Sequence, residues 1–261
     1  MDALGGREKM QKRTKYFWMD LKRMGKGKRN YFAIAGVTFS LFYALEERGL
    51  RQSVLNTYFM AVTLSGLMLA YLFCILPYAF VFCEDLEHNY TRYQIIRGNL
   101  RKYVCSKVAV IYLSSVAAMV LGTVLFVLMC SLKIPWATED LFGLDIMILG
   151  AYGDLIRKGH FFTYCVCYAL QLGLLAGMLS VLAAFISLFI SNKVMVAAIP
   201  VCIYQLGFVG YRGKYFSVYV FQAYNKIFQY SWQCLLFAFA ATMVFVIPIT
   251  FGIIKKLKTR L

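Results

Sequence analysis

Residues 108–132 read VAVIYLSSVAAMVLGTVLFVLMCSL, and no charged side chain occurs among them. An α-helix rises about 1.5 Å per residue, so a helix over this stretch is longer than the roughly 30 Å hydrocarbon core of a bilayer. Lipid offers no partner for backbone polar groups, and a helix satisfies them internally. The stretch therefore predicts a membrane-spanning helix.

Other apolar stretches of similar character occur on both sides of this one. The second of them is long and contains Pro77, which removes a helix hydrogen bond and favours a kink. The first is short, so it must thin the bilayer locally or begin in the preceding segment. We therefore predict an all-α integral membrane protein with six transmembrane helices. The predicted spans are residues 31–45, 55–82, 108–132, 161–190, 194–211 and 233–254.

The composition supports lipid as the solvent for these segments. Hydrophobic residues make up 61% of the 261 residues and charged residues 15%, whereas a soluble domain carries about 25% charged residues. The formal net charge is +16. In a soluble protein this charge would suggest nucleic acid, but here the basic residues flank the apolar stretches, so we expect no nucleic-acid partner.

The placement of Lys and Arg orients the predicted spans. If the N-terminus is cytoplasmic, the cytoplasmic segments hold 20 of the 28 basic residues, as the positive-inside rule requires. We therefore expect a multi-pass protein of a bacterial plasma membrane with both termini in the cytoplasm. The predicted organisation is a basic cytoplasmic tail and interfacial helix (1–30), a six-helix transmembrane domain (31–254) and a basic cytoplasmic tail (255–261).

Two segments outside the spans have their own character. Residues 15–29 place Phe17, Trp18, Leu21 and Met24 among basic residues at helical spacing, which predicts a short amphipathic helix in the membrane interface. An ordinary juxtamembrane basic tail is the alternative. Residues 133–160 are partly polar, and we leave open whether they are re-entrant or interfacial.

Several function classes lack the residues they need. The predicted spans contain no Asp or Glu in their interiors, whereas proton- or sodium-coupled carriers usually need such a group. His88 and His160 are expected on opposite sides of the membrane and cannot share a metal. The run GFVGYRGK, residues 207–214, misses the spacing of a phosphate-binding loop. We therefore predict no catalytic residue, no metal site and no cofactor bound by this chain.

One cytoplasmic segment is distinctive. Residues 84–107 read EDLEHNYTRYQIIRGNLRKYVCSK, with acidic residues first and basic residues before the next span. Acidic groups in the first turn of a helix are favourable. The segment is either a solvated loop that obeys the positive-inside rule or a short helix that contacts a cytoplasmic partner.

At this segment the chain resembles the membrane subunit of an ABC-2 type ABC exporter. Such permeases commonly follow their second span with an acidic cluster, an Asn or Thr, a short apolar stretch, an Arg and a Tyr-Val-x-Ser-Lys-like return to the membrane. One departure is that Gly98, Asn99 and Leu100 stand where the family often has Leu-Pro before the Arg. The residues that fit are Glu84, Asp85, Asn89, Thr91, Arg101, Tyr103, Val104, Ser106 and Lys107.

The resemblance implies a transport subunit, not an enzyme, that works with a second permease copy or paralogue. Separate ABC ATPase subunits would bind ATP and Mg and dock on a cytoplasmic coupling helix within residues 84–107. The interfacial helix would ride on the ATPase. The coupling residues it implies are Glu84, Asp85, Glu87, Asn89, Thr91, Arg97, Leu100, Arg101, Tyr103 and Lys107.

The resemblance also implies an outer re-entrant segment before the last helix, within residues 212–232. Tyr224, Ile227 and Phe228 follow helical spacing there, although an aromatic belt at the membrane interface explains them equally well.

The expected cargo follows from the apolar and aromatic spans. Such surfaces suit a hydrophobic or amphipathic substrate, such as a peptide, lipid or drug-like molecule, better than a small ion. We favour export of an amphipathic or antimicrobial peptide. The alternatives are a membrane-embedded enzyme or scaffold, or a secondary carrier, with no ATPase partner. For an enzyme, His160, Asp154 and Asp145 are the outer-side candidates.

Overall fold

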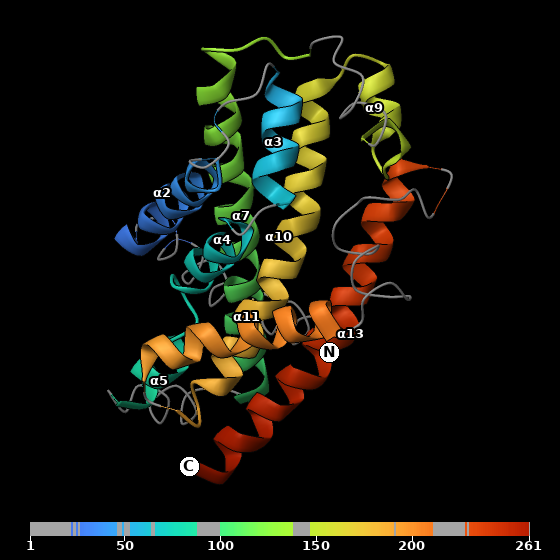
Figure 1. Ribbon diagram of the computed structural model, residues 1–261. Helices are drawn as coiled ribbons and strands as arrows, with labels where there is room; N and C mark the ends of the chain where they lie inside the picture. Colours follow the sequence, from blue (N-terminus) through green and yellow to red (C-terminus); the bar gives the residue numbers. More distant parts are fainter. Residues whose placement is uncertain are drawn as a thin grey trace.

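The described part of the chain is helical. The computed structural model describes residues 22, 25, 27–45, 49, 53–63, 66–87, 100–137, 147–190, 192–210, 228 and 230–260, and no strand occurs among them. Its helices are α2 (Lys28–Tyr43), α3 (Val54–Thr63), α4 (Gly66–Ile75), α5 (Val81–Glu87), α7 (Leu100–Ser131), α9 (Gly153–Arg157), α10 (Phe161–Ile186), α11 (Lys193–Gly210) and α13 (Ser231–Arg260) (Figure 1).

Three of these helices are long and apolar enough to cross a membrane. They are α7, α10 and α13, with 32, 26 and 30 residues. The prediction of an all-helical protein with membrane-spanning helices is confirmed to this extent. Two of these helices extend past the spans predicted for them: α7 begins at Leu100, and α13 continues to Arg260. The Leu, Arg and Lys residues there favour helix although they are not apolar as a group.

The other predicted spans correspond to shorter or broken helices. α2 has 16 residues and α11 has 18, with Pro200 inside it, so α2 rises only about 24 Å. The second span is divided: α3 and α4 are bent by 75° relative to each other and count as one further span at most. After α4 the chain turns through residues 76–80, which include Pro77, before α5 begins. Six spans therefore stay a prediction.

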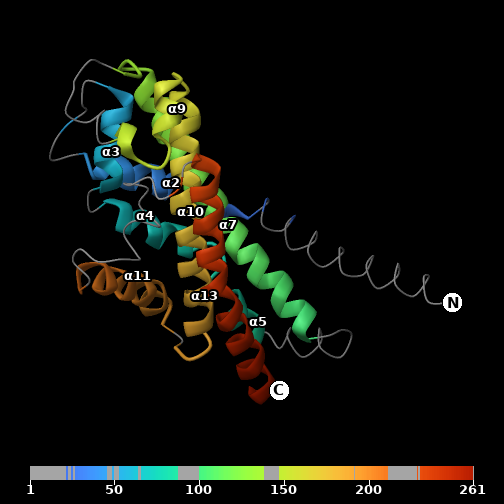
Figure 2. The same cartoon turned by 90° about the vertical axis from the view of Figure 1, so that its right-hand side faces the viewer.

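The helices pack around α7 and α10, which contact each other along their length. α2 packs against α4 and α7, α13 lies along α10, and α11 crosses α10 and α4 (Figures 1 and 2). The start of α7, α5 and the C-terminal end of α13 lie at one end of this bundle, and α9 lies at the other. We call the first of these the basic end because Lys102 lies at the start of α7 and Lys255 and Lys258 lie in the last turns of α13.

Small residues let the central helices approach closely. A Cβ atom built at Gly122 on α7 would lie 2.6 Å from the Cβ of Val37 on α2. In the same contact the Thr38 hydroxyl donates to the Gly122 carbonyl at 3.0 Å. The Ser115 hydroxyl donates to the Cys74 carbonyl at 2.9 Å and lies 2.6 Å from the Ser180 hydroxyl. Small and hydroxyl-bearing residues are typical of helix contacts in membranes.

Residues 147–160 fold against α10. Tyr152 is 1% exposed, and its hydroxyl donates to the Gln171 side-chain oxygen on α10 at 2.7 Å. Burial raises the pKa of Tyr152, so the phenol stays protonated and can donate. Part of the connection that the sequence left open is thus packed against the bundle.

Replacing Tyr152 with Phe is expected to lower the free energy of unfolding by about 0.5–1.5 kcal/mol, because a buried donor is lost at constant shape. Thermal unfolding in detergent would measure it. Tyr230→Phe is the matched control, since Tyr230 is 55% exposed. Equal effects of the two substitutions would contradict a structural role for the buried hydrogen bond.

Candidate functional site at the junction of α5 and α7

A buried ion pair joins α5 to α7 at the basic end. Tyr103 and Lys107 stand four residues apart on α7, so they share one helix face. Both side chains reach Asp85 on α5: the Tyr103 hydroxyl donates to its carboxylate at 2.5 Å, and the Lys107 ammonium donates to the same oxygen. Lys107 is 5% exposed and Asp85 8%. The structure thus connects the first and last parts of the segment that the sequence singled out.

Because the Asp85–Lys107 ion pair is buried, each charged group is stable there only while the other is present. Removing a charge from water costs several kcal/mol, and an opposite charge with good hydrogen bonds compensates for it. The Tyr103 hydroxyl adds a second donor to the Asp85 carboxylate, and the Tyr103 ring lies 5.3 Å from the Lys107 ammonium. These contacts account for the burial of two charged groups where α5 packs on α7.

A second ion pair joins α2 to α5. The Arg29 guanidinium lies 2.8 Å and 3.2 Å from the two carboxylate oxygens of Glu84. The Arg29 side chain is 58% exposed and that of Glu84 26%, so water screens the pair and its contribution is about 0–1 kcal/mol. It lies at the first turn of α5, where an acidic group also interacts favourably with the helix dipole.

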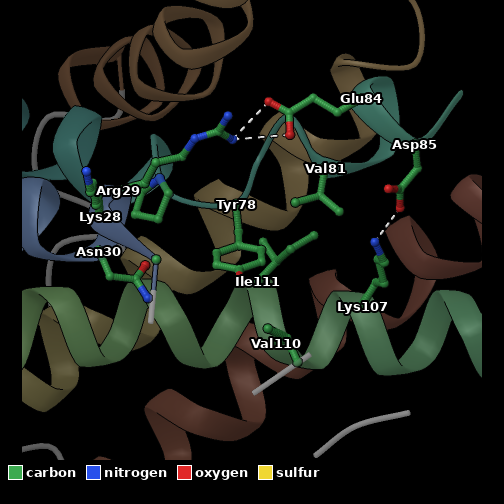
Figure 3. Close-up of a pocket in the computed structure, with 12 residues that line it drawn as sticks. Lys28, Arg29, Asn30, Tyr78, Val81, Glu84, Asp85, Lys107, Val110 and Ile111 are labelled. Atoms are coloured by element: carbon green, nitrogen blue, oxygen red, sulfur yellow. Dashed lines mark hydrogen bonds and ion pairs between the residues drawn. The ribbon is translucent and has the colours of Figure 1, made fainter. Parts of the chain in front are cut away.

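A cavity of about 310 Å³ lies between the two ion pairs. Figure 3 shows Arg29 and Glu84 on one side of it, Asp85 and Lys107 on the other, and Tyr78 between them. This space could hold several water molecules or an inserted side chain. Its lining residues are Gly27, Lys28, Arg29, Asn30, Pro77, Tyr78, Val81, Glu84, Asp85, Lys107, Val110 and Ile111.

No protein-family model, no curated protein and no solved structure matches the chain.

The remaining predicted coupling residues are divided by the limits of the described chain. Glu87 closes α5, and Leu100 and Arg101 open α7, where Leu100 packs against the core and Arg101 is exposed. The predicted coupling helix falls largely on residues 88–99, which lie outside the described residues, as do Asn89, Thr91 and Arg97.

Both other predicted sites lie mostly outside the described residues, namely Phe17, Trp18, Leu21, Met24, Tyr224 and Ile227. Phe228 is described, and its ring packs edge-on against Phe237 of α13 at 5.4 Å. Among the described residues no three His, Cys, Asp or Glu side chains gather as metal ligands. The ion pairs and the cavity are thus the polar site that the described chain presents at its basic end.

Sequence reasoning missed the pairing of Asp85 with Lys107. It placed both residues in the polar segment between two spans and predicted that both couple to an ATPase. The four-residue spacing of Tyr103 and Lys107 was a readable signal for a common helix face, but their shared partner is 22 residues from Lys107. Only the packing of α5 on α7 brings the three together.

Proposed function

We propose that this chain is the permease subunit of an ABC-2 type exporter, with six membrane spans and cytoplasmic termini. The pattern of residues 84–107 carries the proposal. The contacts of Asp85 with Tyr103 and Lys107 support it, because they fix the two ends of this segment to each other. A segment anchored at both ends can transmit a push from a docked protein to α5 and α7.

The Arg29–Glu84 pair supports a link from the same segment to α2. In the proposed mechanism, ATP binding closes a dimer of separate ATPase subunits, and residues 84–107 carry that motion to the spans. A second permease copy or paralogue completes the transport path. The apolar α7 and α13 favour a hydrophobic or amphipathic cargo, and an amphipathic peptide is the cargo we propose.

Reversing the charge of Arg101 tests this proposal. The tagged chain would be purified from its native membranes and assayed for ATP hydrolysis in liposomes. We expect a P-loop ATPase to copurify and to hydrolyse ATP, and Arg101→Glu to reduce both its recovery and its activity at least fivefold. The loss is expected because the negative charge of Glu at this exposed position would repel the ATPase surface that Arg101 complements.

The matched control is Arg157→Glu, which makes the same charge change at the exposed last residue of α9, at the other end of the bundle. It is expected to leave the ATPase bound and active. Asp85 and Lys107 are unsuitable for this test, since their replacement would also destabilise the fold. If Arg101→Glu left both recovery and ATP hydrolysis unchanged, the coupling role of residues 84–107 would be wrong.

A further inference from the structure

α7 and α13 leave an apolar groove between them near the basic end. Its volume is about 480 Å³, and its walls include Val108 and Leu113 from α7 with Met243, Ile247 and Phe251 from α13. The two helices contact each other, and in Figure 1 they come together toward the basic end. Ile247 and Phe251 are more than half exposed. The groove thus opens outward from the bundle, in the direction of the lipid for a membrane-embedded chain.

Cationic side chains lie where the groove meets the basic end. Lys102 precedes the groove residue Cys105 by three positions on α7, and Lys258 follows the groove residue Ile254 by four on α13. Residues three or four apart share a helix face, so each lysine continues one wall of the groove. Lys255, one turn after Phe251, adds a third. All three lysines are exposed.

This combination of surfaces has a specific chemical complement. The apolar walls suit a hydrocarbon chain, and clustered basic residues at a membrane surface attract anionic lipid head groups. We propose that the groove between α7 and α13 binds an anionic phospholipid, with an acyl chain along the walls and its phosphate at Lys102, Lys255 and Lys258. The inference does not depend on the proposed exporter function.

Charge argues against a second copy of the chain as the occupant. In a twofold dimer the same patch is present on both sides of the interface. Two such grooves facing each other would bring six lysines together, and like charges across an interface are unfavourable. A lipid phosphate is negatively charged, so it attracts the lysines and reduces the repulsion among them.

Native cysteines provide a direct probe. Cys105 is exposed and lines the groove, whereas Cys202 is exposed on α11, away from it. The purified full chain in detergent would be labelled with a maleimide after addition of phosphatidylglycerol or of phosphatidylcholine with the same acyl chains, and the rate at each cysteine read by peptide mass spectrometry. We expect phosphatidylglycerol to slow labelling of Cys105 at least fivefold and to leave Cys202 unchanged.

Two variants assign the protection to the proposed contacts. The triple substitution Lys102→Ala, Lys255→Ala and Lys258→Ala is expected to remove the difference between the two lipids. Ala109→Phe, which fills the groove from α7, is expected to prevent tight binding, seen as loss of retained phosphatidylglycerol in native mass spectrometry. Lys193→Ala is the control, since Lys193 is exposed but does not line the groove, and it should behave as the unmodified chain.

Several results would overturn the inference. Equal protection of Cys105 by both lipids would show that the lysines do not select the anionic head group. Protection by soluble inorganic phosphate alone would show that an anion binds without the acyl chain. Slow labelling of Cys105 without lipid, together with cross-linking of Cys105 between two copies, would show that a second chain covers the groove.

Discussion

Replacing Lys107 with Met is expected to lower the free energy of unfolding by about 3–5 kcal/mol, because it leaves the Asp85 carboxylate buried without its cation. The two side chains are 6% and 10% exposed, so the remaining carboxylate is largely removed from bulk water. Asp85→Asn should cost a comparable amount for the opposite reason, since a buried ammonium then lacks its anion. Thermal or denaturant unfolding in one detergent would measure both.

The Arg29–Glu84 pair provides the matched control. It joins the same helix α5 to a neighbour, but the Arg29 side chain is 58% exposed, so Arg29→Met is expected to cost about 1 kcal/mol or less. The double variant Asp85→Leu with Lys107→Met should be more stable than either single variant, because no unpaired charge remains. Equal losses for Lys107→Met and Arg29→Met would show that burial does not set the strength of the inner pair.

The long helices could be predicted because their signal is local. α7, α10 and α13 each contain a stretch of apolar residues long enough for a bilayer, and nothing beyond that stretch decides it. Their ends were less accurate: α7 begins eight residues before the predicted span. Hydropathy locates the part of a helix that suits lipid, whereas the helix itself continues wherever residues such as Arg101 and Lys102 favour it.

The bend between α3 and α4 could not be read from the sequence. Residues 55–82 are apolar nearly throughout, and the proline that suggested a kink, Pro77, lies after α4. The 75° bend separates Thr63 from Gly66 instead. A helix can change direction there when its neighbours fix the path, and this depends on contacts that a linear pattern does not contain. The same reason hid the candidate site, because Asp85 and Lys107 meet only through the packing of α5 on α7.

Replacing Gly122 with Ala is expected to force α2 and α7 apart and to destabilise the fold. The new Cβ would lie 2.6 Å from the Val37 Cβ and 3.0 Å from the Ile34 carbonyl oxygen. Both atoms are fixed to the α2 backbone, so they cannot rotate away, and α2 must move from α7. Overpacking of this kind costs about 1–3 kcal/mol or more, and the separation also stretches the Thr38–Gly122 hydrogen bond.

Gly→Ala substitutions at three positions separate the effect of the steric clash on stability from the effect of the added methyl group itself. At Gly173 the nearest atoms of Val116 lie 3.3 Å from the built Cβ, and at Gly25 nothing lies within 4 Å. Stability in detergent should therefore fall in the order Gly25→Ala, Gly173→Ala, Gly122→Ala. The first should be neutral or slightly stabilising, because Ala favours helix over Gly by about 1 kcal/mol.

A compensating variant tests the contact itself. Val37→Gly combined with Gly122→Ala moves the missing Cβ from α7 to α2, so the helices can again approach. The double variant should lose less stability than the sum of its two single variants, since residues in contact do not act additively. Strict additivity, or a Gly122→Ala variant as stable as Gly25→Ala, would mean that α2 and α7 do not pack at this distance in the membrane-embedded protein.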